Sequence, residues 1–189
     1  MNTSFTEAIY DIFEQISTYN KTLWPKSIST IYLAGGAAVH FYTNARRSDD
    51  IDAIMEPIKP AIPDHLGTTW DNNGVVESVS FDTTYHPYFG LLAEDYMDRA
   101  VHIKEIGGNL SLYVLHPIDL VITKVLRYSD ADAEDIEHLV QHKEFNVDVF
   151  KQLAQESLDA RGMASHYQNH IQWVIDAYES HQQPDRDYS

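Results

Sequence analysis

The 189-residue sequence predicts an α+β fold, in which a mixed sheet with flanking helices is followed by a carboxy-terminal helical lobe. Two observations support this prediction. Short β-branched and aromatic runs dominate up to about residue 115, and from His116 onward the apolar residues repeat at helical spacing. We therefore expect an α/β lobe with an amino-terminal helix over residues 1–115, a helical lobe over 116–182 and a flexible tail over 183–189.

The elements of the first lobe follow from caps, turns and periodicity. Ser4 and Glu7 have the spacing of a capping box at the start of an amphipathic run, and a glycine pair separates a β-branched run from a short helical one. The turn signal Asp71-Asn72-Asn73-Gly74 predicts a hairpin. The expected elements are a helix over 4–20, strands over 30–34 and 50–55, a helix over 37–42, and strands over 66–71, 75–81, 101–106 and 110–114.

The second lobe should consist of four helices. Pro117 suits the first turn of a helix, and the apolar spacing beyond it remains helical. The expected helices cover residues 117–127, 132–142, 147–158 and 165–180.

Composition and charge exclude several classes of protein. The chain has no cysteine, no apolar run long enough to cross a membrane and no secretory leader at its amino terminus, so we expect a cytoplasmic protein without a membrane partner. Its formal net charge of −16 would repel a phosphate backbone over most of the surface, which excludes extended non-specific binding to nucleic acid. A local basic site remains open, because Arg46, Arg47, Lys124 and Arg127 lie beside the motifs described below; the alternative is that they are ordinary surface charges.

The stretch RRSDDIDAIM contains the candidate metal ligands Asp50 and Asp52. Side chains alternate along a strand, so these two carboxylates should lie on one face together with Ile54. Two like charges on a half-buried surface need a cation or shared protons, and Mg²⁺ prefers oxygen ligands of this kind. The other interpretation is a strand entry with solvated acids, because D-x-D is a common tripeptide.

The glycine pair Gly35-Gly36 is the candidate phosphate-binding turn. After a strand, glycine lets the backbone approach a phosphate at the amino end of the following helix, where N–H groups and the helix dipole favour anions. Close packing of the strand on the helix is the alternative reading. The order of strand, Gly-Gly, helix, Arg46, Ser48 and D-I-D favours a site for phosphate and metal.

With its residues in this order, the stretch LAGGAAVHFYTNARRSDDIDAI resembles the opening motif of the DNA-polymerase-β-like nucleotidyltransferase superfamily. FDTTYHPYFGLLAEDYMDRA and HPIDLVITKVLRYSDADAEDI look like segments of a bacterial branch related to AbiEii-type toxins of toxin–antitoxin and phage-defence systems. The resemblance covers about residues 30–140. It implies a polymerase-β-like fold and a Mg²⁺-dependent enzyme, with a two-metal site, that moves a nucleoside monophosphate from an NTP to a hydroxyl.

The resemblance also assigns the residues of the first lobe. Gly35 and Gly36 fall on its phosphate-binding positions, and Asp50 and Asp52 on its metal positions. Asp82 is the expected third metal carboxylate, with Glu77 as the alternative. Arg46 and Ser48 should orient the carboxylates or contact a phosphate.

In the helical lobe, the toxin-like motifs fall on Leu120 and Lys124 and on Asp132 and Asp135. Lys124 could neutralise the triphosphate, with Arg127 on the same helix face, unless both belong to a solvated face. The two aspartates could act as general bases toward the incoming hydroxyl, anchor Lys124, or complement a helix dipole.

The expected partners are an NTP, an acceptor that is an RNA or tRNA end or a protein, and a possible cognate antitoxin. Two positions depart from the family pattern: Gly36-Ala37 stands where many members have a serine, and Ser129-Asp130-Ala131 stands where the toxins carry basic residues. These departures favour an alternative, a non-catalytic module that binds partners. A metal-dependent phosphohydrolase is a third interpretation.

Overall fold

The computed structural model describes residues 2–44, 46–56, 60–86, 90–127 and 129–182; the predicted tail lies outside them. The chain forms two compact units, Met1–His86 with Met97–Leu115, and Pro87–Tyr96 with His116–Ser189. Residues 90–96 therefore group with the carboxy-terminal helices, whereas the sequence placed them in the first lobe. Among the described residues, no helix has the length and apolar character needed to cross a bilayer.

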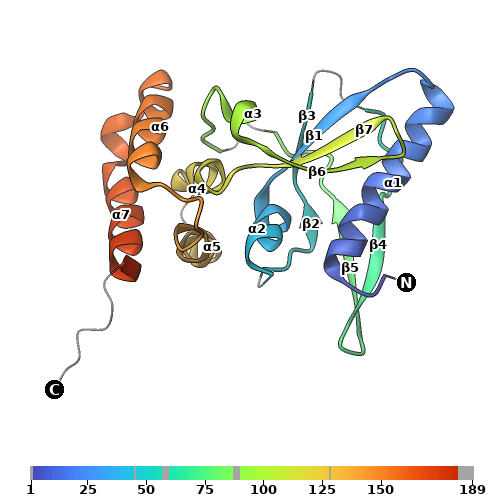
Figure 1. Ribbon diagram of the computed structural model, residues 1–189, viewed down its shortest axis with the longest axis horizontal. Coiled ribbons are helices and arrows are strands. Elements are labelled where there is room, and N and C mark those ends of the chain that lie inside the picture. The colour runs from blue at the N-terminus through green and yellow to red at the C-terminus, as the bar shows by residue number, and fades with distance from the viewer. Residues whose placement is uncertain (1, 45, 57–59, 87–89, 128, 183–189) are drawn as a thin grey trace. The chain divides into compact units, whose positions relative to one another are not determined.

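The first unit begins with helix α1 (Phe5–Leu23), which packs on strands β4 and β5 (Figure 1). The side chain of Ser4 caps it by accepting a hydrogen bond from the Glu7 amide, and Thr3 donates to the Glu7 carboxylate. Its buried face carries Phe5, Ile9, Ile12, Phe13 and Ile16, at the spacing that predicted an amphipathic helix.

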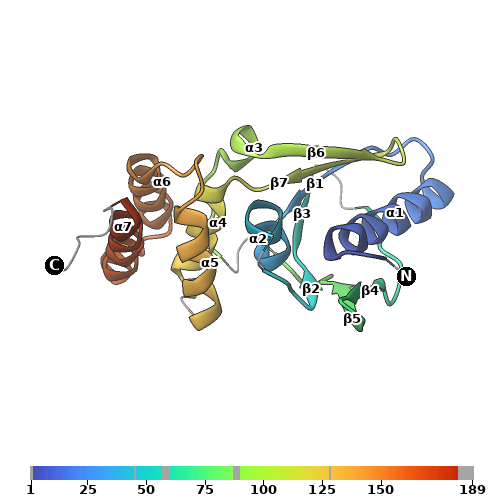
Figure 2. The same ribbon diagram turned by 60° about the horizontal axis from the view of Figure 1, so that its bottom comes forward.

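Two small sheets follow, and both are mixed. The four-stranded sheet has the order β3 (Ala53–Glu56), β1 (Ser29–Leu33), β7 (Leu110–Val114) and β6 (Val101–Ile106). In it β1 pairs in parallel with β7 and antiparallel with β3. The three-stranded sheet has the order β2 (Asp50–Ile51), β5 (Val75–Phe81) and β4 (Gly67–Asn72), with β2 parallel to β5 (Figure 2).

The expectation of one strand over residues 50–55 is wrong. The chain passes from one sheet to the other at Asp52. Strand β2, before it, pairs with β5, whereas β3, after it, pairs with β1. Asp52 itself lies in neither strand, and its carbonyl oxygen accepts a hydrogen bond from the Ala34 amide at 2.9 Å. The D-x-D segment therefore links the two sheets.

Helix α2 (Gly35–Thr43) follows β1 directly and lies against β2. Five of its nine residues are buried, so it is a core helix and not a surface one. It begins at the glycine pair, two residues earlier than predicted. Asn44 follows its last residue and adopts the left-handed conformation (φ 54°) typical of a C-cap. A short helix that was not predicted, α3 (Tyr96–Arg99), precedes β6.

The second unit is helical. It contains α4 (Pro117–Val125), α5 (Asp130–Val140), α6 (Val147–Ala160), the 3₁₀ turn η2 (Ala164–His166) and α7 (Gln168–Gln182). All nine residues of α4 are buried. Helices α5 and α6 pack against α4, and α7 packs on α5 and α6 (Figure 1). Helix α4 ends two residues before its predicted end. Helix α5 begins two residues earlier than predicted, because Ser129 caps it, and it also ends two residues earlier.

Candidate active site

Three carboxylates meet at one place in the first unit. Asp50, Asp52 and Asp82 each offer an oxygen atom, and these atoms lie within 4.8 Å of one another. Asp50 is exposed and the other two are partly exposed, so the cluster faces solvent. The structure therefore brings together the three residues that the sequence analysis selected as metal ligands.

Pairing between β2 and β5 brings Asp82 to the other two aspartates. Asp50 lies opposite Ser80 and Ile51 opposite Phe81, and the Asp82 amide continues the ladder by donating to the Ile51 carbonyl at 3.0 Å. The Asp82 carboxylate then accepts hydrogen bonds from the amide and the hydroxyl of Thr84, at 2.7 and 2.6 Å. These contacts fix the carboxylate at the end of β5.

Glu77, the alternative third ligand, points elsewhere. Its carboxylate accepts a hydrogen bond from the Asn72 side chain at 2.6 Å, within the β4–β5 hairpin. Glu77 is not part of the described carboxylate cluster.

Gly35 makes room for the Asp52 carboxylate. A Cβ atom at Gly35 would lie 2.9 Å from Cγ of Asp52 and closer still to its Oδ2. The residue also has φ +58°, a left-handed conformation that side chains rarely adopt. Both facts explain why glycine stands here, and they show that Asp52 packs directly against the start of α2.

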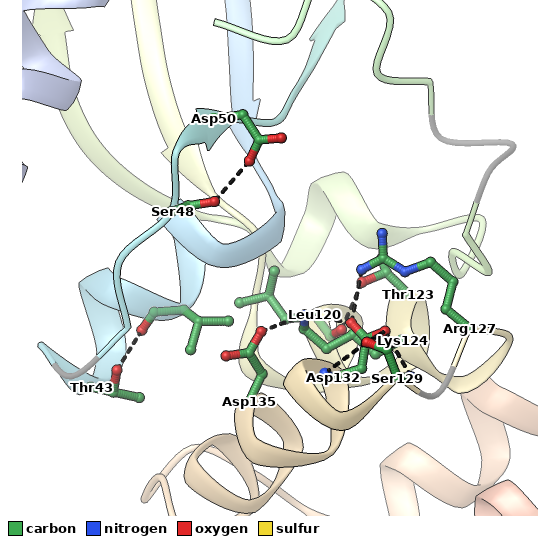
Figure 3. A network of polar contacts seen from close by, with 11 residues as sticks. Thr43, Ser48, Asp50, Leu120, Thr123, Lys124, Arg127, Ser129, Asp132 and Asp135 are labelled. Atoms are coloured by element: carbon green, nitrogen blue, oxygen red, sulfur yellow. Dashed lines mark hydrogen bonds and ion pairs between the residues drawn. The ribbon is translucent and has the colours of Figure 1, made fainter. Parts of the chain in front are cut away.

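Gly36 leaves room for side chains of the loop that precedes β2. A Cβ atom at Gly36 would lie 3.2 Å from Oγ of Ser48 and 3.3 Å from Nε of Arg46. The Ser48 hydroxyl donates to Oδ1 of Asp50 at 2.8 Å (Figure 3). Four of the predicted nucleotide-binding residues thus gather beside the carboxylates at the amino end of α2: Gly35, Gly36, Arg46 and Ser48. The fifth, Arg127, belongs to the helical unit, where it pairs with Asp132.

His40 supports this loop, although the sequence analysis did not select it. Its Nδ1 donates to the Arg46 carbonyl at 2.9 Å, and its Nε2 lies 3.0 Å from the Thr6 hydroxyl. Burial lowers the pKa of His40, and the charge of Arg47 adds to this effect, while the hydrogen bond to Arg46 opposes it. The sequence feature that could have identified His40 is its position four residues after Gly36, on the same face of α2.

The donor set suits a hard divalent cation. Carboxylate oxygens are the ligands that Mg²⁺ prefers, and three of them this close would repel one another without a cation or shared protons. A divalent metal ion therefore fits this group of three carboxylates.

A second polar cluster lies in the helical unit, around Lys124 (Figure 3). The ammonium group of this residue, only 2% exposed, donates to Asp135 at 2.7 Å and to Asp132 at 3.1 Å. Arg127 donates to the same oxygen of Asp132 at 2.8 Å, and Ser129 donates to its other oxygen. The cluster ties α4 to the capped start of α5.

This geometry bears on the roles expected of these residues. Two of the roles considered for the aspartates are present in the structure. Both residues anchor Lys124, and Asp132 also lies in the first turn of α5, where it completes a capping box with Ser129. Burial alone would raise the pKa of Asp132, but the charge of Lys124 and the hydrogen bonds from Ser129, Arg127 and Lys124 lower this pKa to about 2. A carboxylate with so low a pKa is a weak base. Arg127, with 54% of its side chain exposed, differs from Lys124 in reaching solvent.

Comparisons with known proteins place the chain in a family. No curated protein matches it. A solved structure, an antigenic nucleotidyltransferase-like protein from Paracoccidioides brasiliensis, aligns over 93% of this chain and 94% of that chain, with 14% identity and a TM-score of 0.45. Residues 7–183 match the family described as "Nucleotidyltransferase of unknown function (DUF6036)". The match spans nearly the whole chain, so the protein belongs to this family of nucleotidyltransferases of unknown function.

Proposed function

We propose that the protein is a Mg²⁺-dependent nucleotidyltransferase, which moves a nucleoside monophosphate from an NTP to a hydroxyl acceptor. The observation that carries this proposal is the cluster of Asp50, Asp52 and Asp82 beside the glycine turn of α2. Membership of a nucleotidyltransferase family supports it.

The three aspartates would hold the metal, in a two-metal arrangement as the sequence resemblance implies. Bound there, Mg²⁺ would neutralise phosphate charge and polarise the α-phosphate, as paired divalent ions do in phosphoryl displacements. Ser48 holds the carboxylate of Asp50, and Gly35 leaves the space that the carboxylate of Asp52 occupies.

The start of α2 would receive the triphosphate. Backbone N–H groups and the helix dipole favour anions at a helix amino terminus. Arg46, packed against Gly36, would add a positive charge there. In this proposal Lys124 acts through the helical unit, as the anchor of Asp132 and Asp135, and Arg127 is its more exposed neighbour.

The transfer itself is a single displacement at the α-phosphorus. The acceptor oxygen forms a bond to this phosphorus, while the bond from the phosphorus to the oxygen that bridges the α- and β-phosphates breaks. That oxygen leaves with the bonding electron pair as part of pyrophosphate. The proton of the acceptor hydroxyl passes to the Asp82 carboxylate, and positioning together with charge neutralisation provides the catalysis.

By resemblance to AbiEii-type toxins, we propose a toxin-like or phage-defence role. The acceptor would then be an RNA or tRNA end or a protein, and a cognate antitoxin would control the activity. A non-catalytic partner-binding module is the second candidate. The observation in its favour is the burial of Lys124 within an ion-pair cluster, which leaves its charge engaged inside the protein.

The test uses purified protein, Mg²⁺ and each of four α-labelled NTPs, with cellular RNA and cellular protein as separate acceptors. The wild type should label one fraction, and the Asp50→Asn/Asp52→Asn variant should label none while keeping its melting temperature. Glu77→Gln is the matched control, because it removes a carboxylate from β5 that lies outside the triad. It should transfer label at the wild-type rate.

Three other outcomes would reject the proposal. Labelled free nucleoside monophosphate without any transfer would indicate the phosphohydrolase. Equal labelling by wild type and the double variant would exclude the triad from the chemistry. Absence of both transfer and a Mg²⁺-dependent thermal shift with every NTP would favour the non-catalytic module.

A further inference from the structure

An open depression lies beside Asp82 in the first unit. It has a volume of about 410 Å³ and is lined by Pro60, Ile62, Pro63, Asp64, His65 and Thr83. Thr83 follows Asp82 directly in the chain. The depression therefore begins one residue from a proposed metal ligand, and its volume falls in the usual range for ligand sites.

Two sets of hydrogen bonds hold the walls of this depression. The Asn20 side chain on α1 donates to the Ala61 carbonyl at 2.7 Å and accepts from the Ala61 amide at 2.8 Å. The Phe81 amide donates to the Leu66 carbonyl at 3.0 Å, which sets the 60–66 segment beside the end of β5. His65 has φ +59°, a conformation that costs a non-glycine residue energy and recurs at functional sites.

The order of contacts between elements separates the depression from the proposed triphosphate site. Helix α2 lies against β2, which carries Asp50, and β2 pairs with β5, which ends at Asp82. On the other side of β5 comes β4, and the segment leading into β4 is the wall that contains His65. In this chain of contacts, the ends of β2 and β5 that carry Asp50 and Asp82 come between α2 and the depression.

That order matters for a displacement at phosphorus. The attacking and leaving oxygens lie roughly in line on opposite sides of the transferred group. If pyrophosphate leaves on the α2 side, as the proposed function has it, the acceptor must enter from the side of Asp82 and Thr83.

We infer that the depression binds the acceptor, and that this acceptor carries its hydroxyl on a phosphate-free group, either a protein side chain or a small molecule. The inference rests on the proposed function, and it narrows the acceptors named there by excluding an RNA or tRNA end.

The chemistry of the walls supports a phosphate-free acceptor. Two prolines and Ile62 offer apolar surface, and the charged group among the six described lining residues is the carboxylate of Asp64; Lys59 lies outside the described residues. The whole chain carries a net charge of −16. An RNA end would bring further phosphates toward these negative charges, whereas an unphosphorylated hydroxyl would not.

Two variants fill the depression and a third changes its charge. Ile62→Trp enlarges a half-buried wall residue, and Thr83→Phe does the same from an exposed position, where folding should tolerate it. Asp64→Lys replaces the exposed acidic side chain by a basic one. Glu14→Lys, an equal change of charge at an exposed site, is the matched control; it removes an exposed ion pair with Lys104.

Each variant is assayed with α-labelled NTP and Mg²⁺ against cellular protein, a low-molecular-mass extract and RNA, while NTP affinity is measured by thermal shift. We expect Ile62→Trp and Thr83→Phe to lose about tenfold or more in transfer, with NTP affinity unchanged within about twofold. Label should enter the protein or the small-molecule fraction, and these two arms identify the source of the hydroxyl. Asp64→Lys should not raise transfer above the level of the Glu14→Lys control.

The outcomes separate this inference from the proposed function. Transfer to RNA by the wild type, a gain of transfer to RNA in Asp64→Lys, or wild-type transfer by both filling variants would overturn the acceptor assignment while the transferase remains. A wild type that transfers label to no fraction would reject the proposed function itself.

Discussion

Replacing Gly35 by alanine should separate the geometry of the metal site from the stability of the fold. The left-handed backbone at φ +58° costs an L-residue roughly 1–2 kcal/mol in the free energy of unfolding. For a chain of this size that loss corresponds to a decrease in melting temperature of about 2–8 °C. The added methyl group would also displace the side chain of Asp52.

The second effect follows from the distances. The new Cβ atom would lie 2.9 Å from Cγ and 3.0 Å from Cβ of Asp52, whereas ordinary contacts begin at 3.4 Å. The carboxylate must therefore move by about half an ångström or more, out of the cluster with Asp50 and Asp82. Changes that misplace metal ligands commonly cost roughly 10- to 100-fold in metal affinity or activity, and we expect a loss of this size.

Gly74→Ala provides the matched control. Gly74 also has a positive φ, +88°, but a Cβ atom there would meet nothing within 4 Å. Melting temperature and Mg²⁺-dependent NTP binding, the latter by isothermal titration, are measured for both variants. Both variants should melt below the wild type, Gly35→Ala by at least as much as Gly74→Ala, and Gly35→Ala alone should lose binding. Equal NTP affinity in the two variants would refute the assignment of Gly35 as the residue that makes room for Asp52.

Two further predictions concern the helical unit. Lys124→Met should lower the free energy of unfolding by about 3–5 kcal/mol, because two buried carboxylates would lose the ammonium group that both bind, and Asp132 would keep the half-exposed Arg127. Urea denaturation measures this loss, and a value below about 1 kcal/mol would contradict the prediction. The contribution of Asp132 should depend on pH, because its folded pKa of about 2 lies below the ordinary 3.8. The resulting stabilisation, about 2 kcal/mol, should be fully present above pH 3.8 and be lost as pH falls toward 2. Urea unfolding of the wild type and Asp132→Asn at pH 5 and pH 2.5 tests this, and an equal difference at both pH values would speak against it.

Local patterns predicted most elements of the fold. The capping box and the apolar spacing of Phe5 to Ile16 placed α1, and the D-N-N-G turn placed the β4–β5 hairpin. These signals act over a few residues, because caps, turns and side-chain periodicity depend on neighbours in the chain. For the same reason, the sequence order of glycine pair, Ser48 and D-x-D was enough to select the residues that meet at the start of α2.

The tertiary structure decided what depends on distant partners. The break at Asp52 was not predictable, because the pairing of β2 with β5 and of β3 with β1 joins segments far apart in the sequence. The state of Lys124 was equally open: its spacing on α4 is consistent with a phosphate-binding face or a solvated one, and the packing of α5 shows instead that the side chain is buried.

The sequence by itself therefore determined which residues can form the candidate site, because residue type and local spacing fix which chemistry each one can supply. Only the tertiary structure decided which of them share a place, since strand pairing and helix packing are chosen by the free energy of burying the whole core. It selected Asp82 over Glu77, engaged Lys124 in an ion-pair cluster, and built the depression beside Asp82 from a loop that α1 holds in place.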